Sequence, residues 1–399
     1  MITVEQAEAI IQSQIRNYGV EEVDYSVAVG RVLAEALSAD RDFPAFNRAT
    51  VDGIAISFNA IDSGIRSFNI AATQAAGAPP CAVASMDQCI EIMTGAAVDE
   101  SVDTVIRYED LELSGSEATL KDLKIIKGAN IHLQGADQKK NDVVAGAGRI
   151  ITPAVIGLAG SIGKARLTVK KLPRIIIITT GDELVDIEET PTPYQLRRSN
   201  GVTIKAVIAR YGIDADMIHL KDDYNLIKSE LNRCLQEYDV ILMSGGVSMG
   251  KFDYVPKVLE ELSVKELFHK VKQKPGKPFW FGHHENQTLI FAFPGNPVSV
   301  FMCLHRYFIP WLDKVLGLKV HTPEYAILKN KVSAAFPLQF FAQVQLCRDP
   351  TGRLSAEVIS SNGSGDFSNL IYTDAFMEFP MDNKEFHKGE IFRIWRYIT

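Results

Sequence analysis

Three short apolar runs, rich in β-branched residues, mark the middle of the chain as a set of buried strands. They lie at about residues 174–178, 239–243 and 289–293. Apolar residues recur with helical spacing at about 200–211 and 225–234, and again after the third run at 297–311. Ser199 or Asn200 is expected to cap the first of these helices, and Gly212 to end it. Strand and helix alternate, which predicts a doubly wound α/β domain over residues 172–320.

The second of these strands leads into a loop with unusual chemistry, Ser-Gly-Gly-Val-Ser-Met-Gly-Lys-Phe-Asp at 244–253. Glycines allow backbone N–H groups to approach a phosphate closely, and serine hydroxyls add hydrogen-bond donors. For an isolated Gly-Gly pair a surface turn is the alternative interpretation, and further loops of the same kind argue against it. Asp253 would repel a phosphate unless a divalent cation lies between them. The candidate phosphate ligands are Ser244, Gly245, Gly246, Ser248 and Gly250.

The first strand also ends in charged residues. Its loop, Thr-Thr-Gly-Asp-Glu at 179–183, places the carboxylates of Asp182 and Glu183 next to each other, directly after Gly181. Two adjacent carboxylates are unfavourable unless they are solvated or bind a cation. Both are therefore candidate metal ligands.

The third strand is flanked by a basic loop and a proline-rich loop. Residues 270–278 contain four lysines and two prolines that stiffen the loop, and Pro-Gly-Asn-Pro follows the strand at 294–297. In doubly wound folds, ligands bind outside the carboxyl ends of the strands, where all these loops would meet. The sequence therefore predicts a site for a phosphorylated, anionic ligand handled with a divalent cation. It contains neither a Walker loop nor a G-x-G-x-x-G fingerprint.

Taken together, these loops resemble the MoeA-type molybdopterin molybdenumtransferases, or molybdenum insertases, a family related to the C-terminal part of gephyrin. The similar segments in the central region are Thr-Gly-Asp-Glu-Leu at 180–184, Ser-Gly-Gly-Val-Ser at 244–248, Lys-Pro-Gly-Lys-Pro at 274–278 and Pro-Gly-Asn-Pro-Val-Ser at 294–299. Upstream, the similar segments are 47–53, 94–109 and 128–137. The similarity therefore covers nearly the whole chain.

The resemblance implies an enzyme that inserts molybdenum from molybdate into adenylylated molybdopterin, releases AMP and requires Mg²⁺. It also implies an elongated, four-domain homodimer with a shared active site. The molybdopterin adenylyltransferase is a candidate partner that the resemblance implies. The catalytic candidates that it implies are Asp52, Thr94, Asp137, Glu183, Asp222, Lys270 and Lys274, the first three coming from the other subunit. The implied ligands of the pterin substrate are Gly181, Ser244, Gly245, Gly246, Ser248, Gly250, Lys277, Pro294, Asn296 and Pro297. The implied metal ligands are Asp182, Glu183 and Asp253.

Several positions depart from the pattern of this family. His132 stands where arginine is favoured, and Arg198 where aspartate is common. In the last part of the chain, residues 340–344 lack the arginine of an F-x-R-V pattern, and Asn369 replaces a serine. These last two places lie near the anion site in the family. The departures favour an alternative, a non-catalytic paralogue or scaffold that binds molybdopterin or a nucleotide, whereas the acidic and lysine loops favour the enzyme. The sequence does not distinguish molybdate from tungstate.

The pattern outside the central region predicts three further domains. A capping box at Thr3 begins an amphipathic helix expected to reach about Tyr18. Residues 1–46 and 136–171 are expected to form a discontinuous mixed domain, which a β-rich domain at 47–135 interrupts. Residues 321–399 alternate again, with a hairpin turn at 349–352, and predict a small C-terminal β-barrel.

Composition limits the possible partners and location. At 399 residues the chain is too long for one hydrophobic core, and its net charge of −7 argues against a nucleic-acid surface. No apolar run approaches the roughly 20 residues that a membrane helix requires. The first residues lack the features of a signal peptide. Five cysteines without a C-x-x-C pair indicate reduced thiols, so we expect a cytoplasmic protein without membrane contact.

Overall fold

The computed structural model describes all residues except 123, 248–253, 319–321, 335–336, 361–362 and 399. Its residues form two compact units. The first comprises residues 1–34, 148–152 and 168–399, and the second comprises residues 35–147 and 153–167. The division into four domains stays a prediction. Among the described residues, no helix combines the length and the apolar character needed to cross a membrane.

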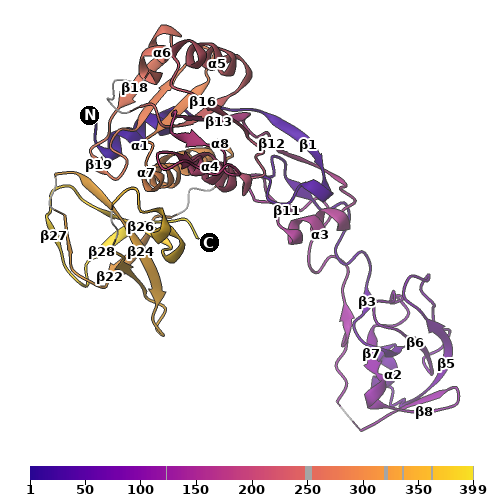
Figure 1. Ribbon diagram of the computed structural model, residues 1–399. Helices are drawn as coiled ribbons and strands as arrows, with labels where there is room; N and C mark the ends of the chain where they lie inside the picture. Colours follow the sequence, from indigo (N-terminus) through magenta and orange to yellow (C-terminus); the bar gives the residue numbers. More distant parts are fainter. Residues whose placement is uncertain (123, 248–253, 319–321, 335–336, 361–362, 399) are drawn as a thin grey trace. The chain divides into compact units, whose positions relative to one another are not determined.

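The first unit contains a six-stranded mixed sheet. Four of its strands run parallel, and β20 is antiparallel to both of its neighbours. In spatial order the strands are β16 (Asp216–Leu220), β13 (Ile175–Thr180), β17 (Val240–Ser244), β21 (Leu289–Phe293), β20 (Trp280–His283) and β18 (Lys265–His269). The three predicted strands are therefore adjacent at the centre of the sheet (Figure 1).

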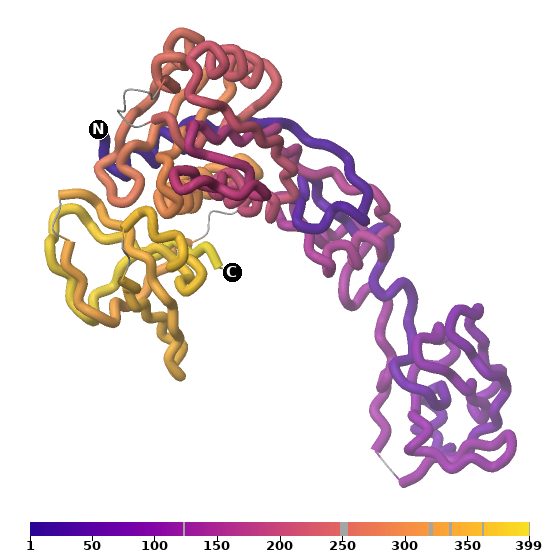
Figure 2. The backbone as a smooth tube through the Cα atoms, in the orientation of Figure 1, coloured from indigo at the N-terminus to yellow at the C-terminus, as the bar shows by residue number. Residues whose placement is uncertain are grey.

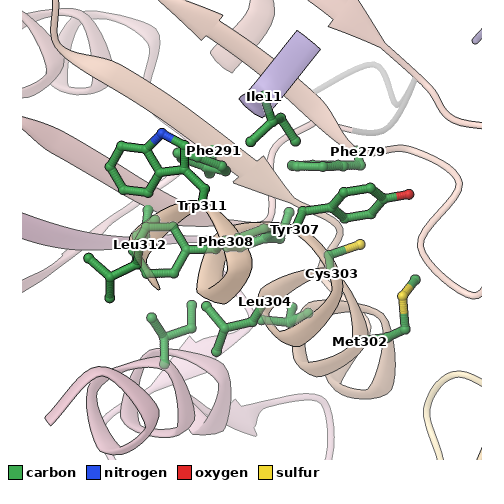
Figure 3. Close-up of a cluster of buried hydrophobic side chains, with 14 of the residues drawn as sticks. Ile11, Phe279, Phe291, Met302, Cys303, Leu304, Tyr307, Phe308, Trp311 and Leu312 are labelled. Carbon is green, nitrogen blue, oxygen red and sulfur yellow. The ribbon is translucent and has the colours of Figure 1, made fainter. Parts of the chain in front are cut away.

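Helices cover both faces of this sheet, which explains why its central strands are apolar throughout. Alternate residues of β13 point to opposite faces: Ile175 and Ile177 belong to one hydrophobic cluster, and Ile176 and Ile178 to the other. Figure 3 shows the aromatic part of the first cluster. The helices on that face are α4 (Ser199–Ala209), α7 (Pro297–Cys303), the π-helical turn η3 (Leu304–Phe308) and α8 (Ile309–Val315). Those on the other face are α5 (Tyr224–Glu237) and α6 (Val255–Glu261).

The N-terminal helix α1 (Val4–Ser13) packs against the first of these clusters. Its predicted capping box is confirmed, because Thr3 and Gln6 exchange side-chain to backbone hydrogen bonds. Its expected extension to about Tyr18 is wrong, because the helix ends at Ser13. In addition, Ile2 pairs with Val271 in a parallel bridge, so the chain start lies beside the basic loop (Figure 2).

A closed five-stranded β-barrel follows the sheet and confirms the predicted C-terminal fold. Closure is complete because β24 pairs with both β25 and β26, and β28 joins β22 to β26. The hairpin between β24 and β25 turns at Asp349, whose carbonyl accepts from the Gly352 amide at 2.9 Å. Strand β19 (Gln273–Lys274) adds in parallel to β24 and links the basic loop to the barrel. The barrel strands are β22 (Glu324–Leu328), β24 (Gln339–Arg348), β25 (Leu354–Val358), β26 (Ala375–Phe379) and β28 (Ile391–Arg396).

Arg306 is a buried cation that ties three elements of this unit together. It is 2 % exposed and lies in η3. Its guanidinium is 2.7 Å from Glu8 of α1 and 3.6 Å from Glu378 of β26. The same group stacks over the Trp395 ring at 4.1 Å from the centroid. The N-terminal helix, the helical layer and the barrel therefore share one charge network.

The second unit is rich in β-structure. Its largest sheet has the order β7 (Thr104–Arg107), β4 (Gly53–Ile56), β6 (Gln88–Ile92), β5 (Ser67–Gln74), β9 (Glu117–Leu120) and β8 (Leu111–Ser114). Apolar residues on its two faces form separate clusters, one around Ile54 and Phe68 and one around Ile90 and Val105. The smaller elements are α2 (Phe58–Asp62), α3 (Pro153–Ser161), and the strand pair of β3 (Arg48–Ala49) with β10 (Ile131–His132).

The remaining elements of the chain are short. They are β1 (Val20–Asp24), β2 (Leu37–Ser38), β11 (Val143–Ala145), β12 (Arg166–Lys170), β14 (Leu184–Val185), β15 (Leu196–Arg197), β23 (Val332–Ser333), β27 (Glu385–Phe386), and the 3₁₀ turns η1 (Tyr25–Val27), η2 (Tyr108–Asp110) and η4 (Phe367–Tyr372).

Replacing Arg306 with alanine is expected to lower the free energy of unfolding by about 3–5 kcal/mol, because it leaves Glu378 poorly solvated and without its cation. Arg233 is the matched control, since it pairs with Glu230 and Glu237 on an exposed helix surface. Arg233→Ala should change the free energy by less than about 1 kcal/mol. Urea denaturation of both variants measures the difference, and equal losses would contradict the role of Arg306.

Candidate functional site

The carboxyl ends of the central strands meet at one edge of the sheet. The strand register pairs Thr179 with Ser244 and Ser244 with Phe293, and it pairs Thr180 with Leu220. The loops that begin at residues 181, 221, 245 and 294 therefore leave the sheet side by side. The predicted convergence of these loops is confirmed.

Glycine is required at 245 because the first two loops touch. Gly245 has a φ of +96°, and a Cβ there would lie 2.8 Å from the carbonyl oxygen of Thr180. A Cβ on Gly246 would likewise meet the Thr180 hydroxyl at 2.9 Å. This hydroxyl is buried and has no hydrogen-bond partner among the described residues. A buried hydroxyl without a described partner, beside the partly exposed backbone of two glycines, is suited to a polar ligand.

The Asn200 side chain forms hydrogen bonds at the start of two of these loops instead of capping a helix. Its side-chain amide donates to Ser244 Oγ at 2.9 Å and to the Gly295 carbonyl at 2.7 Å. The predicted cap at Ser199 or Asn200 is wrong, because α4 begins at Ser199 after Arg198 and has no side-chain cap. Arg198, one of the departures, forms an ion pair with Asp186. Side chains at the start of α4, those of Arg198 and Asn200, therefore bind the neighbouring loops. The helical pattern in the sequence did not reveal these contacts.

The acidic residues approach each other from two loops. Asp182 Oδ1 accepts a hydrogen bond from the Asp222 amide at 3.2 Å. Glu183 folds back toward Gly181. A Cβ added to Gly181 would lie 2.6 Å from the carboxylate oxygen Oε2 of Glu183. Within the described part of the chain, no group of three or more His, Cys, Asp or Glu side chains forms a metal cage. The predicted ligands Ser248, Gly250 and Asp253 lie outside the described residues.

A cavity of about 410 Å³ opens next to this edge, between the basic loop and the proline-rich loop. Four predicted residues line it: Lys274, Lys277, Pro294 and Asn296. Two other predicted residues, Lys270 and Pro297, are not among the lining residues. The Lys270 amide donates a hydrogen bond to the Phe279 carbonyl, and Pro297 is the first residue of α7. The lining residues that were not predicted as site residues are Gln273, Pro275, Gly276, Pro278, Gly295, Ser299, Leu338 and Ser364.

Of these residues, only Leu338 and Ser364 lie outside the basic loop and the Pro-Gly-Asn-Pro-Val-Ser segment, so they carried no signal in the sequence. Ser364 comes from a loop that precedes η4. It accepts a hydrogen bond from Asn296 Nδ2 at 2.8 Å, and its carbonyl accepts one from the Val298 amide at 3.2 Å. A loop of the barrel region and the start of α7 thus close one side of the cavity together.

The cavity is positively charged. Among the described residues, its lining contains two lysines and no carboxylate. Lys277 forms no ion pair with any described residue, and Ser299 and Asn296 add neutral hydrogen-bonding groups. Since an unpaired cation in a concave wall attracts anions strongly, this cavity is suited to an oxyanion.

A second set of predicted residues lies together in the β-rich unit. Asp52 Oδ1 accepts hydrogen bonds from Thr94, at 2.6 Å from the backbone amide and at 2.8 Å from the hydroxyl. These two bonds lower the pKa of the Asp52 carboxyl below its ordinary value, the backbone amide having the larger effect. The sequence predicted both residues but gave no sign that they touch.

Asp137 belongs to a hydrogen-bonded chain with two side chains of the paired strands. Arg48 and His132 lie directly opposite each other in β3 and β10. Arg48 Nη2 is 3.3 Å from His132 Nδ1, and His132 Nε2 is 3.0 Å from Asp137 Oδ1. A guanidinium can only donate, so Nδ1 accepts and Nε2 carries the hydrogen that is donated to Asp137. The departure at His132 thus still gives Asp137 a hydrogen-bond donor.

Comparison with known protein families identifies matching regions along almost the whole chain. The MoeA N-terminal region (domain I and II) matches residues 2–163, a probable molybdopterin binding domain matches residues 176–314, and the MoeA C-terminal region (domain IV) matches residues 325–397. These boundaries include each set of predicted site residues.

Individual proteins show the same similarity. A molybdopterin molybdenumtransferase from Synechocystis is 36 % identical over 405 residues and covers 100 % of both chains. One from Staphylococcus epidermidis is 30 % identical over 380 residues, which are 92 % of this chain and 89 % of the relative. The crystal structure of a molybdopterin biosynthesis MoeA protein from Pyrococcus horikoshii superimposes with a TM-score of 0.85 at 26 % identity, with both chains fully covered.

Changing Thr94 to valine is expected to raise the pKa of Asp52 toward its ordinary value, because one of the two hydrogen bonds to the carboxylate is lost. The backbone bond remains, so the rise should be partial. The carboxylate would then become protonated at a higher pH, and any activity that needs it ionised would fail earlier on acidification. NMR titration of Asp52 measures the shift, with Thr73→Val on the same unit as a control. An unchanged Asp52 pKa in Thr94→Val would contradict the assignment.

Proposed function

The chain belongs to the MoeA family, and from this membership we propose that it is a molybdopterin molybdenumtransferase. The proposed reaction takes molybdenum from molybdate and inserts it into adenylylated molybdopterin, and AMP is released. The observation that carries the proposal is the lysine-lined cavity of about 410 Å³, which lies beside the glycine loops of a phosphate-type crevice.

The cavity is the proposed place of molybdate. Molybdate is a compact tetrahedral dianion, so it needs positive charge and several hydrogen-bond donors around it. Lys274 and Lys277 supply the charge, and Asn296 and Ser299 supply neutral polar groups. The prolines of the loop limit its freedom, which reduces the entropy lost when an anion is bound.

The adjoining strand edge is the proposed place of the phosphates of the adenylylated pterin. Gly245 and Gly246 present their backbone closely, and the buried Thr180 hydroxyl is without a described partner. Cleavage of the phosphoanhydride builds up negative charge on the departing AMP, and cations nearby lower this barrier. We propose Lys274, which lines the adjoining cavity, for that role.

The acidic loops fit Mg²⁺ in the way typical of phosphate substrates, with one or two carboxylates and substrate oxygens completing the shell. Asp182 and Glu183 are the proposed holders, and Asp222 is joined to Asp182 through its amide. A Mg²⁺ ion bound there would neutralise negative charge on the phosphates of the substrate. Asp253 is retained as a further candidate from the resemblance.

We propose that the working form is a homodimer in which Asp52, Thr94 and Asp137 complete the crevice of the second protomer. The hydrogen-bonded pairs at Asp52 and Asp137 support this, because both carboxylates are held in defined orientations while remaining accessible. A reaction that forms a phosphoanhydride must supply the substrate, which makes the molybdopterin adenylyltransferase the proposed partner. We propose a cytoplasmic location, because all five cysteines are free thiols in the structure.

A binding protein without insertase activity is the second candidate. Gln343 stands where the family has arginine; it is buried, and its Oε1 has no hydrogen-bond partner among the described residues. A neutral amide in place of a cation weakens attraction for a dianion. Single-turnover release of AMP with molybdate, Mg²⁺ and adenylylated molybdopterin distinguishes the two, since the binding protein would retain the nucleotide uncleaved.

Lys277→Ala is expected to raise the KM for molybdate by about tenfold at low salt, because one charge-assisted contact is lost. The difference should shrink as ionic strength rises and screens the charge. Lys277→Arg should retain most of the affinity, and Lys331→Ala, which breaks an exposed pair with Glu385, should have no effect. A wild-type KM in Lys277→Ala would exclude this lysine from the molybdate site.

Mixing two inactive proteins tests the shared site. Asp52→Ala and the double variant Lys274→Ala/Lys277→Ala carry their changes in different units. Random exchange would make half of the dimers mixed, each with one intact site, so about a quarter of the wild-type rate should return. Differently tagged chains establish that exchange has occurred. Exchange without recovery of activity would place all working residues within one chain.

A further inference from the structure

The basic loop has a buried polar side chain beneath it that the proposed reaction does not use directly. Gln273 is 0 % exposed and immediately precedes Lys274. Burying an amide is unfavourable unless each of its groups is hydrogen-bonded. The contacts of Gln273 therefore show what this side chain does.

The Gln273 amide connects the loop to the helical layer. Its Nε2 donates to the Gly276 carbonyl at 2.9 Å and lies 3.4 Å from the Cys303 sulfur. Its Oε1 accepts a hydrogen bond from the Tyr307 hydroxyl. The carbonyl of Gly276 can only accept, so the orientation of the amide is fixed and Tyr307 must donate.

The loop fits tightly on the same surface. Gly276 has a φ of +85°, and a Cβ there would lie 2.7 Å from Cys303 Sγ and 3.0 Å from Met302 Cε. Figure 3 shows Met302, Cys303 and Tyr307 on neighbouring turns, with the tyrosine oxygen directed away from the apolar cluster. Both Cys303 and Tyr307 are buried. The middle of the loop therefore rests on α7 and η3 and cannot move independently of them.

The backbone continues this arrangement on both sides of Gln273. The Val271 amide donates to the Lys277 carbonyl at 2.9 Å, which closes the base of the loop. Gln273 and Lys274 form β19, which pairs with β24 of the barrel. The Val271–Lys277 hydrogen bond and the β19–β24 pairing thus fix the loop through its backbone. The Gln273 side chain adds a hydrogen bond to Gly276, the residue directly before Lys277.

We propose that Gln273 is a positioning residue for the oxyanion cavity. Its amide, oriented by Tyr307, sets the spacing of Lys274 and Lys277 and so determines the affinity of the cavity for a tetrahedral oxyanion. This inference rests on the proposed role of the cavity in binding molybdate. Gln273 lines the cavity, but its amide groups are bonded to Gly276 and Tyr307, so it acts by positioning the two lysines.

Two substitutions test it, with molybdate alone as the probe. Gln273→Met keeps the length and volume of the side chain but removes both hydrogen-bonding groups, and Tyr307→Phe removes only the donor to Oε1. Isothermal titration should give molybdate binding about tenfold weaker in Gln273→Met and roughly threefold weaker in Tyr307→Phe. Thr288→Val is the matched control, since it removes a buried hydroxyl bonded to Leu235 and Tyr238 just before β21, away from the cavity. It should lower the melting temperature to a similar degree without changing molybdate affinity.

Hydrogen exchange of the 270–279 segment separates failure of this inference from failure of the proposed function. The exchange rate should rise in Gln273→Met and Tyr307→Phe and stay unchanged in Thr288→Val. If the wild-type protein does not bind molybdate but the exchange result holds, the ligand assignment is wrong and the positioning of the loop stands. If both substitutions leave molybdate affinity and loop exchange at wild-type values, Gln273 has no positioning role.

Discussion

Burial of the central sheet on both faces is the constraint from which the site follows. Strands β13, β17 and β21 are buried along their whole length, and their side chains enter two separate hydrophobic clusters. Polar groups that must meet a ligand can therefore be placed only beyond the strand ends. The parallel register brings those ends to one edge, so that loops distant in sequence share one surface. Close packing of these loops then requires glycine at 245, where a side chain would collide with Thr180.

The barrel contributes to this surface without forming the crevice itself. Strand β19 pairs with β24, and the Asn296–Ser364 hydrogen bond joins α7 to the loop before η4. Arg306 adds a buried charge between α1, η3 and the barrel. Such a charge is expensive to desolvate, and its value lies more in fixing one arrangement than in net stability. The positions of the cavity lysines depend on this arrangement.

The departures from the family pattern have local explanations of different kinds. His132 keeps Asp137 hydrogen-bonded and itself accepts a hydrogen bond from Arg48. Arg198 pairs with Asp186 next to the acidic loop. Gln343 has no comparable compensation among the described residues, because its buried Oε1 has no partner. Arg198 and His132 therefore find polar partners, whereas Gln343 leaves a buried polar atom without a described partner.

The sequence by itself determined the strands, the glycine and lysine loops and the capping box at Thr3, because each depends on neighbours within a few residues. The hairpin at Asp349 and the barrel class followed from alternation alone. Only the tertiary structure decided that Asn200 bridges Ser244 and Gly295 instead of capping α4, and that Asp52 binds Thr94. The same holds for Gln273, whose hydrogen-bond partners Cys303 and Tyr307 lie 30 and 34 positions away in the chain. A local sequence pattern shows which side of a helix or strand is buried. The partner of a buried polar group depends on packing between elements, and the local sequence does not indicate that packing.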